Sequence, residues 1–434
     1  MESMINSLVA EETNAKLNFS IELEKDRQVY CFIGENGIGK TQLLETIARC
    51  CLYTHSLFVN QSDEYNKIYL LDGIYNHLKE RKLFLPKSIK MNGIEVKKKE
   101  TENWGVADFQ SILNKNRNLV IKKPILFIGA KNRGFAKNVD SEKLEILGGR
   151  AQRFLRAFDK TLNYMHSQEV DEKSVVEWFI TRLIINPDFV SHQDNFKEDV
   201  VLLCKLLKEF EPVKLKDLVV ENPNRKISLN IVYNEGKLLF SGVPFDKLPT
   251  GYISIIKIFQ DIIDGYSSWN FQNLSPIQET EGLVFIDEIE SHLHPKWERS
   301  ILPLLRKHFP KTTFYVTTHS PLIISTTLEG EGYELIAKDN WIFAENLGNP
   351  KNWYLADIYS QCFHVGYSQD LLDTVERVLD LSSKLTFLVK NYTKQKDIQS
   401  KQKAEGILAE LNSLLPESDP RRESINHLGK LLEV

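Results

Sequence analysis

The alternation of apolar and polar residues predicts a chain that mixes strands and helices. Leu17–Leu23 alternates in the manner of a strand with one buried face, whereas Val29–Ile33 is continuously apolar, as a strand buried on both faces should be. Gln42–Ala48 has a helical pattern, and 124–129 is a second continuously apolar run. These segments favour an α/β fold built on a buried sheet.

The remaining segments continue this mixture. The region 143–211 is mainly helical by its apolar spacing, and the chain beyond Asp357 becomes helical again, with a last short helix after Ser418-Asp-Pro420. Between these two regions we expect a hairpin at Lys226–Phe245 that turns at 234–236, a helix at Ile253–Ile263, a strand at Leu283–Ile286, a helix at Trp297–Leu305 and a strand at Thr313–Val316.

Composition places the chain among ordinary globular proteins with ample core. It has 434 residues, 42% of them hydrophobic and 26% charged, enough for two to three domains or one large domain with insertions. No apolar run approaches the ~20 residues of a membrane span, and the N-terminus lacks the layout of a secretory signal. The five cysteines form no C-x-x-C pair, so we expect buried free thiols and a cytoplasmic location.

Charge is unevenly distributed. Residues 79–137 carry 15 Lys and Arg against 5 Asp and Glu, whereas the whole chain has a net charge of −4. Such a segment is compatible with contact to nucleic acid or to an acidic partner, and equally with a solvated surface insertion. Its few aromatic residues do not suggest a platform for stacking bases.

The first chemical motif lies directly after the buried strand Val29–Ile33. Residues 34–41 read Gly-Glu-Asn-Gly-Ile-Gly-Lys-Thr and lead into the helical run, which is the strand–loop–helix setting of a phosphate-binding loop. Glycines let backbone N–H groups turn toward phosphate oxygens, Lys40 reaches the β- and γ-phosphates, and the Thr41 hydroxyl ligates Mg²⁺. The nucleotide-binding residues predicted here are Asn36, Gly37, Ile38, Gly39, Lys40, Thr41 and Gln42.

A second motif is a pair of acids at the end of a buried strand. Asp287 and Glu288 follow Leu283–Ile286, and 247 residues separate Asp287 from Lys40. We expect Asp287 to hold Mg²⁺ with Thr41, and Glu288 to orient and deprotonate an attacking water. The long separation requires a large insertion inside one nucleotide-binding unit.

Two weaker signals accompany these motifs in a fixed order. His319 follows the strand Thr313–Val316, where an imidazole can donate to a γ-phosphate, although a lone histidine is more often structural. Thr250 and Gly251 open an apolar helix 37 residues before Asp287, and a helix N-terminus with a hydroxyl and a glycine suits an anion.

Together the four motifs resemble the ABC ATPase superfamily. The run 287–295 and Thr318-His-Ser-Pro321 look like the branch of SMC, RecF and OLD-type ATPases. The resemblance implies a P-loop ABC-type head that binds ATP and Mg²⁺. It also implies that two heads sandwich two ATP molecules, so that Thr250 and Gly251 act in trans and Ser291–His294 meets the partner head. Pro249 and Tyr252 depart from the transporter signature, which puts fast hydrolysis in doubt.

Two further assignments follow from the resemblance. The family's glutamine after the lobe-switching strand has no clear counterpart, and its role is placed near Lys131 and Arg133. His292 and His294 beside Glu290 invite a metal-site interpretation, but no fourth ligand is evident, and the segment matches the family's dimer contact.

The predicted domains leave no place for a coiled-coil arm or a nuclease. Long heptad runs are absent before Asp287, and no D-x-D follows His319. We expect an ATPase head at 1–142 and 225–345 with a Lys-rich insertion at about 62–122, a helical insertion at 143–224, and a C-terminal helical region at 346–434.

The whole layout resembles bacterial antiphage-defence ATPases that work with a separate nuclease, nearest to the PtuA family of Septu systems, whose partner is an HNH nuclease. This implies a cytoplasmic ATPase that self-associates through ATP sandwiches and scaffolds or regulates a nuclease. A RecF-like ATPase that binds DNA through 79–137 remains the main alternative. An energy-coupling subunit of a membrane complex is disfavoured by the signature segment and the large insertion.

Overall fold

The structure is a computed structural model of the chain. It describes residues 5–11, 13, 16–56, 87–97, 120–131, 133, 150–165, 175–184, 196–209, 219–222, 225–228, 231–234, 237–240, 243–244, 247–269, 276–363, 369–415 and 421–432. These residues form two compact units, 1–363 and 364–434, which are considered separately below.

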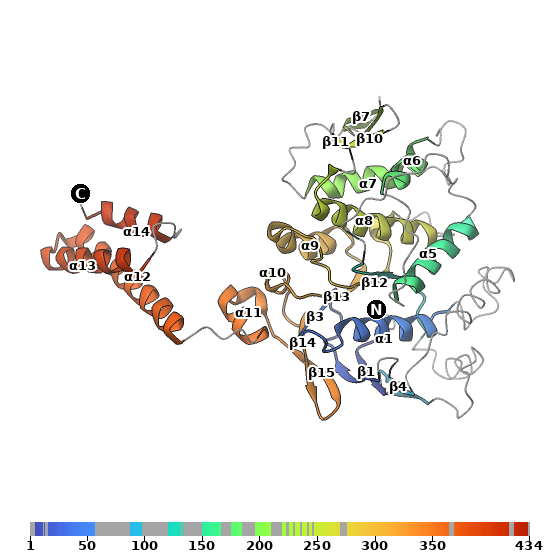
Figure 1. The fold of residues 1–434 in the computed structure, drawn as a ribbon, viewed down its shortest axis with the longest axis horizontal. Helices are drawn as coiled ribbons and strands as arrows, with labels where there is room; N and C mark the ends of the chain where they lie inside the picture. Colours follow the sequence, from blue (N-terminus) through green and yellow to red (C-terminus); the bar gives the residue numbers. More distant parts are fainter. Residues whose placement is uncertain are drawn as a thin grey trace. The chain divides into compact units, whose positions relative to one another are not determined.

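A ten-stranded mixed sheet forms the centre of the first unit (Figure 1). Its order is β5-β4-β1-β2-β15-β14-β3-β13-β12-β6, and β14, β3, β13, β12 and β6 run parallel to one another. The strands are β1 Ser7–Glu11, β2 Asn18–Glu22, β3 Val29–Ile33, β4 Ser88–Met91, β5 Ile94–Lys97, β6 Ile125–Ile128, β12 Gly282–Ile286, β13 Thr312–Thr317, β14 Gly332–Lys338 and β15 Trp341–Asn346.

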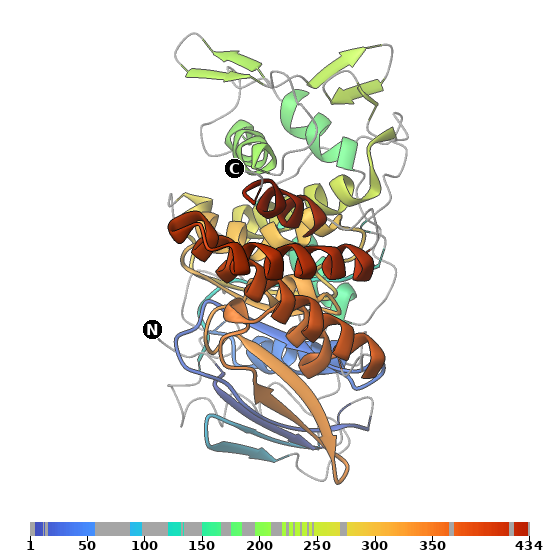
Figure 2. The same cartoon turned by 90° about the vertical axis from the view of Figure 1, so that its left-hand side faces the viewer.

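The parallel strands are the core of the unit. Every residue of β3, β6, β12 and β13 is buried, which explains the continuously apolar sequences of β3 and β6. Strand β13 also buries three threonines, Thr312, Thr313 and Thr317. The antiparallel strands alternate instead, as in β1 and β2. Figure 2 shows these N-terminal strands, in blue, beside the orange hairpin of β14 and β15.

Helices pack on this sheet and on one another. Helix α1 contacts β13 and β6, α5 lies against β6 and α8, and α7 lies on α8. The helices of this unit are α1 Lys40–Tyr53, α5 Arg150–Met165, α6 Val175–Ile184, α7 Lys197–Lys208, α8 Thr250–Trp269, α9 Pro295–His308, α10 Pro321–Ile324 and α11 Leu355–Cys362.

Two small sheets lie outside the central one. One pairs β7 Val219–Asn222 with β8 Arg225–Ser228, and the other joins β9 Ile231–Asn234, β10 Lys237–Phe240 and β11 Val243–Pro244. The predicted hairpin turning at 234–236 is confirmed by the pairing of β9 with β10, although its turn residues 235 and 236 lie outside the described residues.

The second unit is a helical bundle with its own core. It contains α12 Gln369–Gln395, α13 Ile398–Leu414 and α14 Arg421–Lys430, and α13 packs against both of the others. Leu385 and Leu411 are fully buried in this core, and Ile425 of the last helix joins them, as its spacing predicts.

The fold confirms the predicted class. The mixed sheet with a phosphate-loop strand, the helices inserted between β6 and β12, and the C-terminal helices form an α/β P-loop ABC-type head with a helical insertion and a helical tail. All five cysteines are buried and unpaired. None of the described helices is long and apolar enough to cross a membrane. Most of the basic segment 79–137 and of the Lys-rich insertion lies outside the described residues.

Candidate functional site

The register of the sheet brings three motifs to one edge. Because β13 pairs in parallel with both β3 and β12, the carboxyl ends of these strands lie side by side. The phosphate loop, Asp287 and Thr318-His319 follow those three ends directly. This edge is where α/β sheets bind their ligands.

The loop itself needs glycine at two positions. Gly37 has φ 83° and Gly39 has φ 102°, in the region that other residues rarely adopt. A Cβ on Gly39 would also lie 2.8 Å from Leu17 Cδ1. Residues 35–37 are exposed and Ile38 is partly exposed, so the backbone at the loop tip is open to a ligand.

Lys40 is held inside the loop that it follows. Its Nζ donates to the carbonyl oxygens of Gly34 at 2.8 Å and Glu35 at 2.9 Å, and the residue is only 6% exposed. Burial lowers the pKa of Lys40, whereas the carboxylates of Glu290, Glu288 and Asp287 oppose that shift. The loop therefore keeps a desolvated cation at its centre, where a phosphate oxygen could replace the two carbonyls.

Asp287 is the polar centre of the edge. Its carboxylate accepts hydrogen bonds from Thr41 Oγ1 at 3.0 Å and from Thr317 Oγ1 at 2.6 Å. Burial raises the pKa of Asp287, and the two hydroxyls counteract this effect. The hydroxyl–carboxylate pair of Thr41 and Asp287 is the oxygen donor set expected for Mg²⁺, so the predicted metal residues lie together.

Glu288 lies beside this pair on a constrained backbone. Its φ is 43°, an uncommon value for glutamate, and its N–H donates to Thr317 Oγ1 at 2.8 Å. Ser291 Oγ donates to the Glu288 carboxylate at 3.0 Å. The side chain is partly exposed, so it is accessible to water from the open edge.

Arg133 was only weakly indicated by the sequence, yet it lies directly under the acid pair. Its Nη2 donates to the carbonyl oxygen of Asp287 at 2.9 Å and to that of Glu288, and the residue is 1% exposed. Burial lowers its pKa, an effect opposed mainly by Asp287 and Glu290. The Nε and Nη1 atoms are buried with no hydrogen-bond partner among the described residues. The guanidinium fixes the strained turn at 287–288.

His319 follows β13 and faces the same edge. It is partly exposed, and burial together with the nearby Lys40 ammonium lowers its pKa, so the imidazole is neutral near pH 7. Its backbone N–H donates to Glu290 Oε1 at 2.6 Å. Glu290 was considered in the sequence only as a neighbour of His292 and His294, and no pattern in the sequence pointed to this contact.

Thr250 and Gly251 begin the long helix α8 at a different place. Thr250 is exposed, whereas Gly251 packs so closely that a Cβ would lie 2.4 Å from the carbonyl oxygen of His292. Ser254 Oγ also donates to the Ser291 carbonyl oxygen at 2.9 Å. The start of α8 is therefore fixed to the segment 291–294, in which His292 and His294 are exposed.

The metal-site interpretation of His292 and His294 gains no support. In the part of the chain that the structure describes, no group of three or more His, Cys, Asp or Glu side chains is placed to hold a metal ion. His294 instead accepts a hydrogen bond from the Lys296 N–H at the N-terminus of α9.

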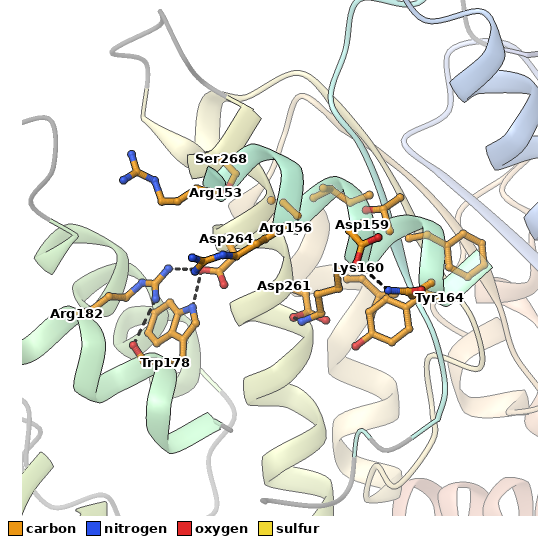
Figure 3. Close-up of a pocket in the computed structure, with 17 residues that line it drawn as sticks. Arg153, Arg156, Asp159, Lys160, Tyr164, Trp178, Arg182, Asp261, Asp264 and Ser268 are labelled. Atoms are coloured by element: carbon orange, nitrogen blue, oxygen red, sulfur yellow. Dashed lines mark hydrogen bonds and ion pairs between the residues drawn. The ribbon is translucent and has the colours of Figure 1, made fainter. Parts of the chain in front are cut away.

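A separate cavity of about 260 Å³ lies between α5, α6, α8 and β6 (Figure 3). Its charged side chains include two ion pairs across helices, Lys160 with Asp261 and Arg182 with Asp264. Trp178 Nε1 also donates to Asp264 at 2.6 Å. These pairs join α5 and α6 to α8.

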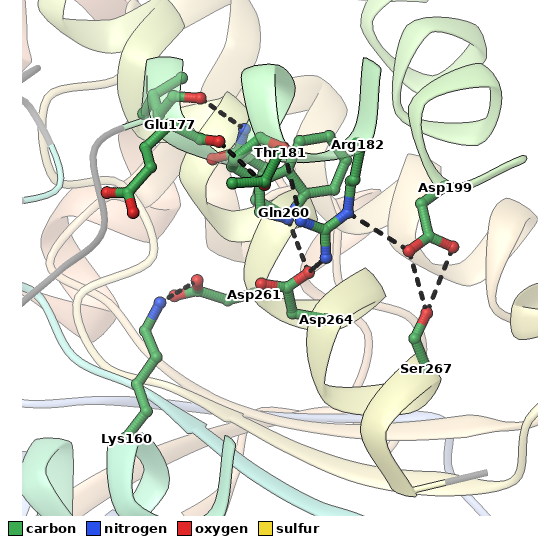
Figure 4. A network of polar contacts seen from close by, with 11 residues as sticks. Lys160, Glu177, Thr181, Arg182, Asp199, Gln260, Asp261, Asp264 and Ser267 are labelled. Carbon is green, nitrogen blue, oxygen red and sulfur yellow. Dashed lines mark hydrogen bonds and ion pairs between the residues drawn. The ribbon is translucent and has the colours of Figure 1, made fainter. Parts of the chain in front are cut away.

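The Arg182 pair belongs to a larger buried network (Figure 4). Arg182 Nε lies 3.4 Å from an oxygen of Asp199 on α7, and Ser267 of α8 donates to that carboxylate at 3.2 Å. Burial raises the pKa of Asp199 to about 6, and Arg182 opposes the shift. The network ties α6 and α7 to the helix that begins at Thr250.

Comparisons with known proteins find similar sequences and a family profile that overlaps part of this site. A family profile described as "AAA domain, putative AbiEii toxin, Type IV TA system" matches residues 271–325, which contain the acid pair and His319. The chain is 25% identical to the Septu protein PtuA of Bacillus mycoides (strain KBAB4) over 73% of this chain and 38% of that protein. It is 34% identical to the Retron Ec83 probable ATPase of Escherichia coli over 29% of this chain and 20% of that protein.

The aligned part spans well under half of the length of these relatives. Among solved structures, an SMC head bound to the C-winged helix domain of ScpA matches with a TM-score of 0.37 and 11% identity, over 79% of this chain and 97% of that one. The sequence similarities, the motifs and the sheet order support an ABC-type ATPase near PtuA.

Proposed function

We propose that this chain, an ABC-type P-loop ATPase similar to PtuA, binds and hydrolyses ATP between two copies of itself and thereby regulates a separate nuclease in antiphage defence. The main observation in support of ATPase activity is the direct hydrogen bond from Thr41 to Asp287, beside the desolvated Lys40. Residues 246 positions apart meet there because the strand ends are adjacent.

Each residue has a role that its surroundings support. Lys40 would exchange the loop carbonyls for phosphate oxygens, and the hydroxyl of Thr41 and the carboxylate of Asp287 would hold Mg²⁺. When bound, Mg²⁺ neutralises charge on the phosphates. Glu288 would take a proton from the attacking water, and the neutral His319 would donate to the terminal phosphate.

Self-association is supported by the surface around the start of α8. The exposed Thr250 and the exposed histidines of the segment 291–294 are adjacent because Gly251 packs on His292. Thr250 also lies at the N-terminus of α8, where the helix dipole favours an anion, although the N–H groups of Tyr252 and Ile253 already donate to the Pro249 carbonyl oxygen. A second copy that covers this surface would bring its own phosphate loop to Thr250.

The nuclease partner is proposed on the resemblance to Septu ATPases. In this proposal the two-headed ATPase assembly holds or releases the nuclease according to its nucleotide state. The chain would act as sensor and scaffold, and would not cleave nucleic acid by itself.

The test is to measure mass in solution and phosphate release with and without ATP and Mg²⁺. The wild-type chain should at least double its mass with ATP and release phosphate. Glu288→Gln should keep the assembly and slow hydrolysis, Lys40→Ala should lose ATP binding, and the exposed Lys384→Ala should match wild type. Retention of ATP by Lys40→Ala, or full turnover by Glu288→Gln, would refute the assigned roles.

Adding DNA to the same assay distinguishes the RecF-like alternative from the proposed nuclease scaffold. Hydrolysis that DNA stimulates, together with DNA binding that weakens steeply with salt, would favour that alternative over a nuclease scaffold.

A further inference from the structure

The turn at residues 318–320, which carries His319, is hydrogen-bonded at two points to the segment 290–298. On its near side, Glu290 accepts hydrogen bonds from Thr318 Oγ1 and from the His319 N–H, each at 2.6 Å. Thr318 is fully buried, and Glu290 and His319 are partly exposed. The Glu290 carboxylate therefore binds the side chain of Thr318 and the backbone N–H of His319.

The second attachment lies on the other side of His319. Ser320 Oγ donates to the carboxylate of Glu298 on α9, and the Ser320 N–H donates to Thr318 Oγ1 at 2.9 Å. Ser320 also caps α10, because its Oγ accepts from the Leu322 N–H at 3.1 Å. Residues 318–320 are thus held between two carboxylates, with His319 in the middle.

Burial and hydrogen bonding act on Glu290 in opposite directions. Burial raises the pKa of Glu290 above its usual value, and the hydrogen bonds from the Thr318 hydroxyl and the His319 N–H offset only part of that rise. Both hydrogen bonds join Glu290 to the turn that carries His319. Loss of this carboxylate would leave the His319 N–H without its acceptor in a half-buried turn.

The position of the two carboxylates along the chain connects them to another surface. Glu290 and Glu298 flank the segment 291–294, whose exposed histidines lie beside the start of α8. His292 also has a φ of 69°, so this segment is a tight, constrained turn. Both carboxylates therefore lie at the ends of one constrained segment.

We propose that Glu290 and Glu298 form a carboxylate clamp that positions His319. The inference rests on the proposed function, because it assigns the residues that hold the histidine of the hydrolytic site. Glu290 is a positioning residue, since it acts through the backbone of His319.

The first test does not require ATPase activity. Amide hydrogen exchange of the peptide containing residues 315–322 should show a protected His319 N–H in wild type and at least tenfold faster exchange in Glu290→Ala. Glu329→Ala, at an exposed glutamate, is the control and should exchange like wild type. Equal protection in Glu290→Ala and wild type would overturn the clamp, whether or not the chain hydrolyses ATP.

The second test separates positioning from binding. Glu290→Ala should lower kcat by about a hundredfold, as expected for a misplaced catalytic group, with the Kd for ATP within twofold of wild type. Glu290→Gln should recover most of kcat, because its amide oxygen still accepts from His319 and its NH₂ donates to Thr318. ATP-dependent self-association should be unchanged in both variants.

Three outcomes would refute the proposal. These are an unchanged kcat in Glu290→Ala, a loss of ATP binding equal to that of Lys40→Ala, and a failure of Glu290→Gln to recover activity. A wild-type chain that lacks hydrolysis altogether refutes the proposed function instead, and the exchange experiment then decides on the clamp alone.

Discussion

Replacing Thr317 by Val tests whether its hydroxyl organises the acid pair. Thr317 is fully buried, and valine has nearly the same shape. The change removes the 2.6 Å hydrogen bond to the Asp287 carboxylate and leaves the Glu288 N–H without its 2.8 Å acceptor. A bond to a charged group contributes about 1.5–3 kcal/mol, and an orphaned buried N–H costs about 1–3 kcal/mol. We therefore expect a loss of about 3–5 kcal/mol.

The assay is urea unfolding of the full chain, followed by the fluorescence of its tryptophans. Thr46→Val is the matched control, because the Thr46 hydroxyl donates only to the Gln42 carbonyl within α1. The control should lose no more than about 1 kcal/mol. The pKa of Asp287 should also rise further without Thr317, because the Thr317 hydroxyl lowers it. A stability loss equal to that of Thr46→Val would show that Thr317 does not hold the acid pair.

Three further predictions concern packing and charge. Gly251→Ala should lose ATP-dependent self-association by light scattering, since its Cβ would lie 2.4 Å from the carbonyl oxygen of His292; wild-type association would contradict the tight packing. Arg182→Met should cost about 3–5 kcal/mol in urea unfolding because it leaves the buried Asp199 carboxylate without its ion-pair partner, whereas the exposed Lys307→Met should cost under about 1 kcal/mol. His55 has its pKa lowered to about 3 by burial, so the unfolded chain binds more protons and stability falls as the pH drops below 6.5. Between pH 6.5 and 5 wild type should lose about 2 kcal/mol more than His55→Asn, and parallel pH profiles would refute this.

The local pattern of the sequence was sufficient for the parallel core. Continuously apolar runs such as Val29–Ile33 favour strands buried on both faces, and glycine spacing with Lys40 and Thr41 indicates the phosphate loop. The strands β14 and β15 were not predicted, because the region after His319 was considered for its motifs and not for its strand pattern. Their place between β2 and β3 depends on pairing with residues more than 300 positions away.

The site shows the same division. Asp287 and Glu288 could be predicted because a buried strand ending in acids has a chemical meaning by itself. Glu290 could not be predicted and Arg133 was only weakly indicated, since each contacts backbone atoms of a distant segment. A bond to a carbonyl or an N–H does not require a particular side chain at the partner position, so it leaves no pattern in the sequence.

Apolar periodicity and motif spacing are local properties, so they were enough to predict which residues could perform the chemistry. The contacts that hold those residues became clear only in the packed fold. Thr41 meets Asp287, and Glu290 meets His319, because three parallel strands end at one edge of the sheet. Strand order depends on the free energy of the whole packed sheet, and no single segment of the chain encodes it.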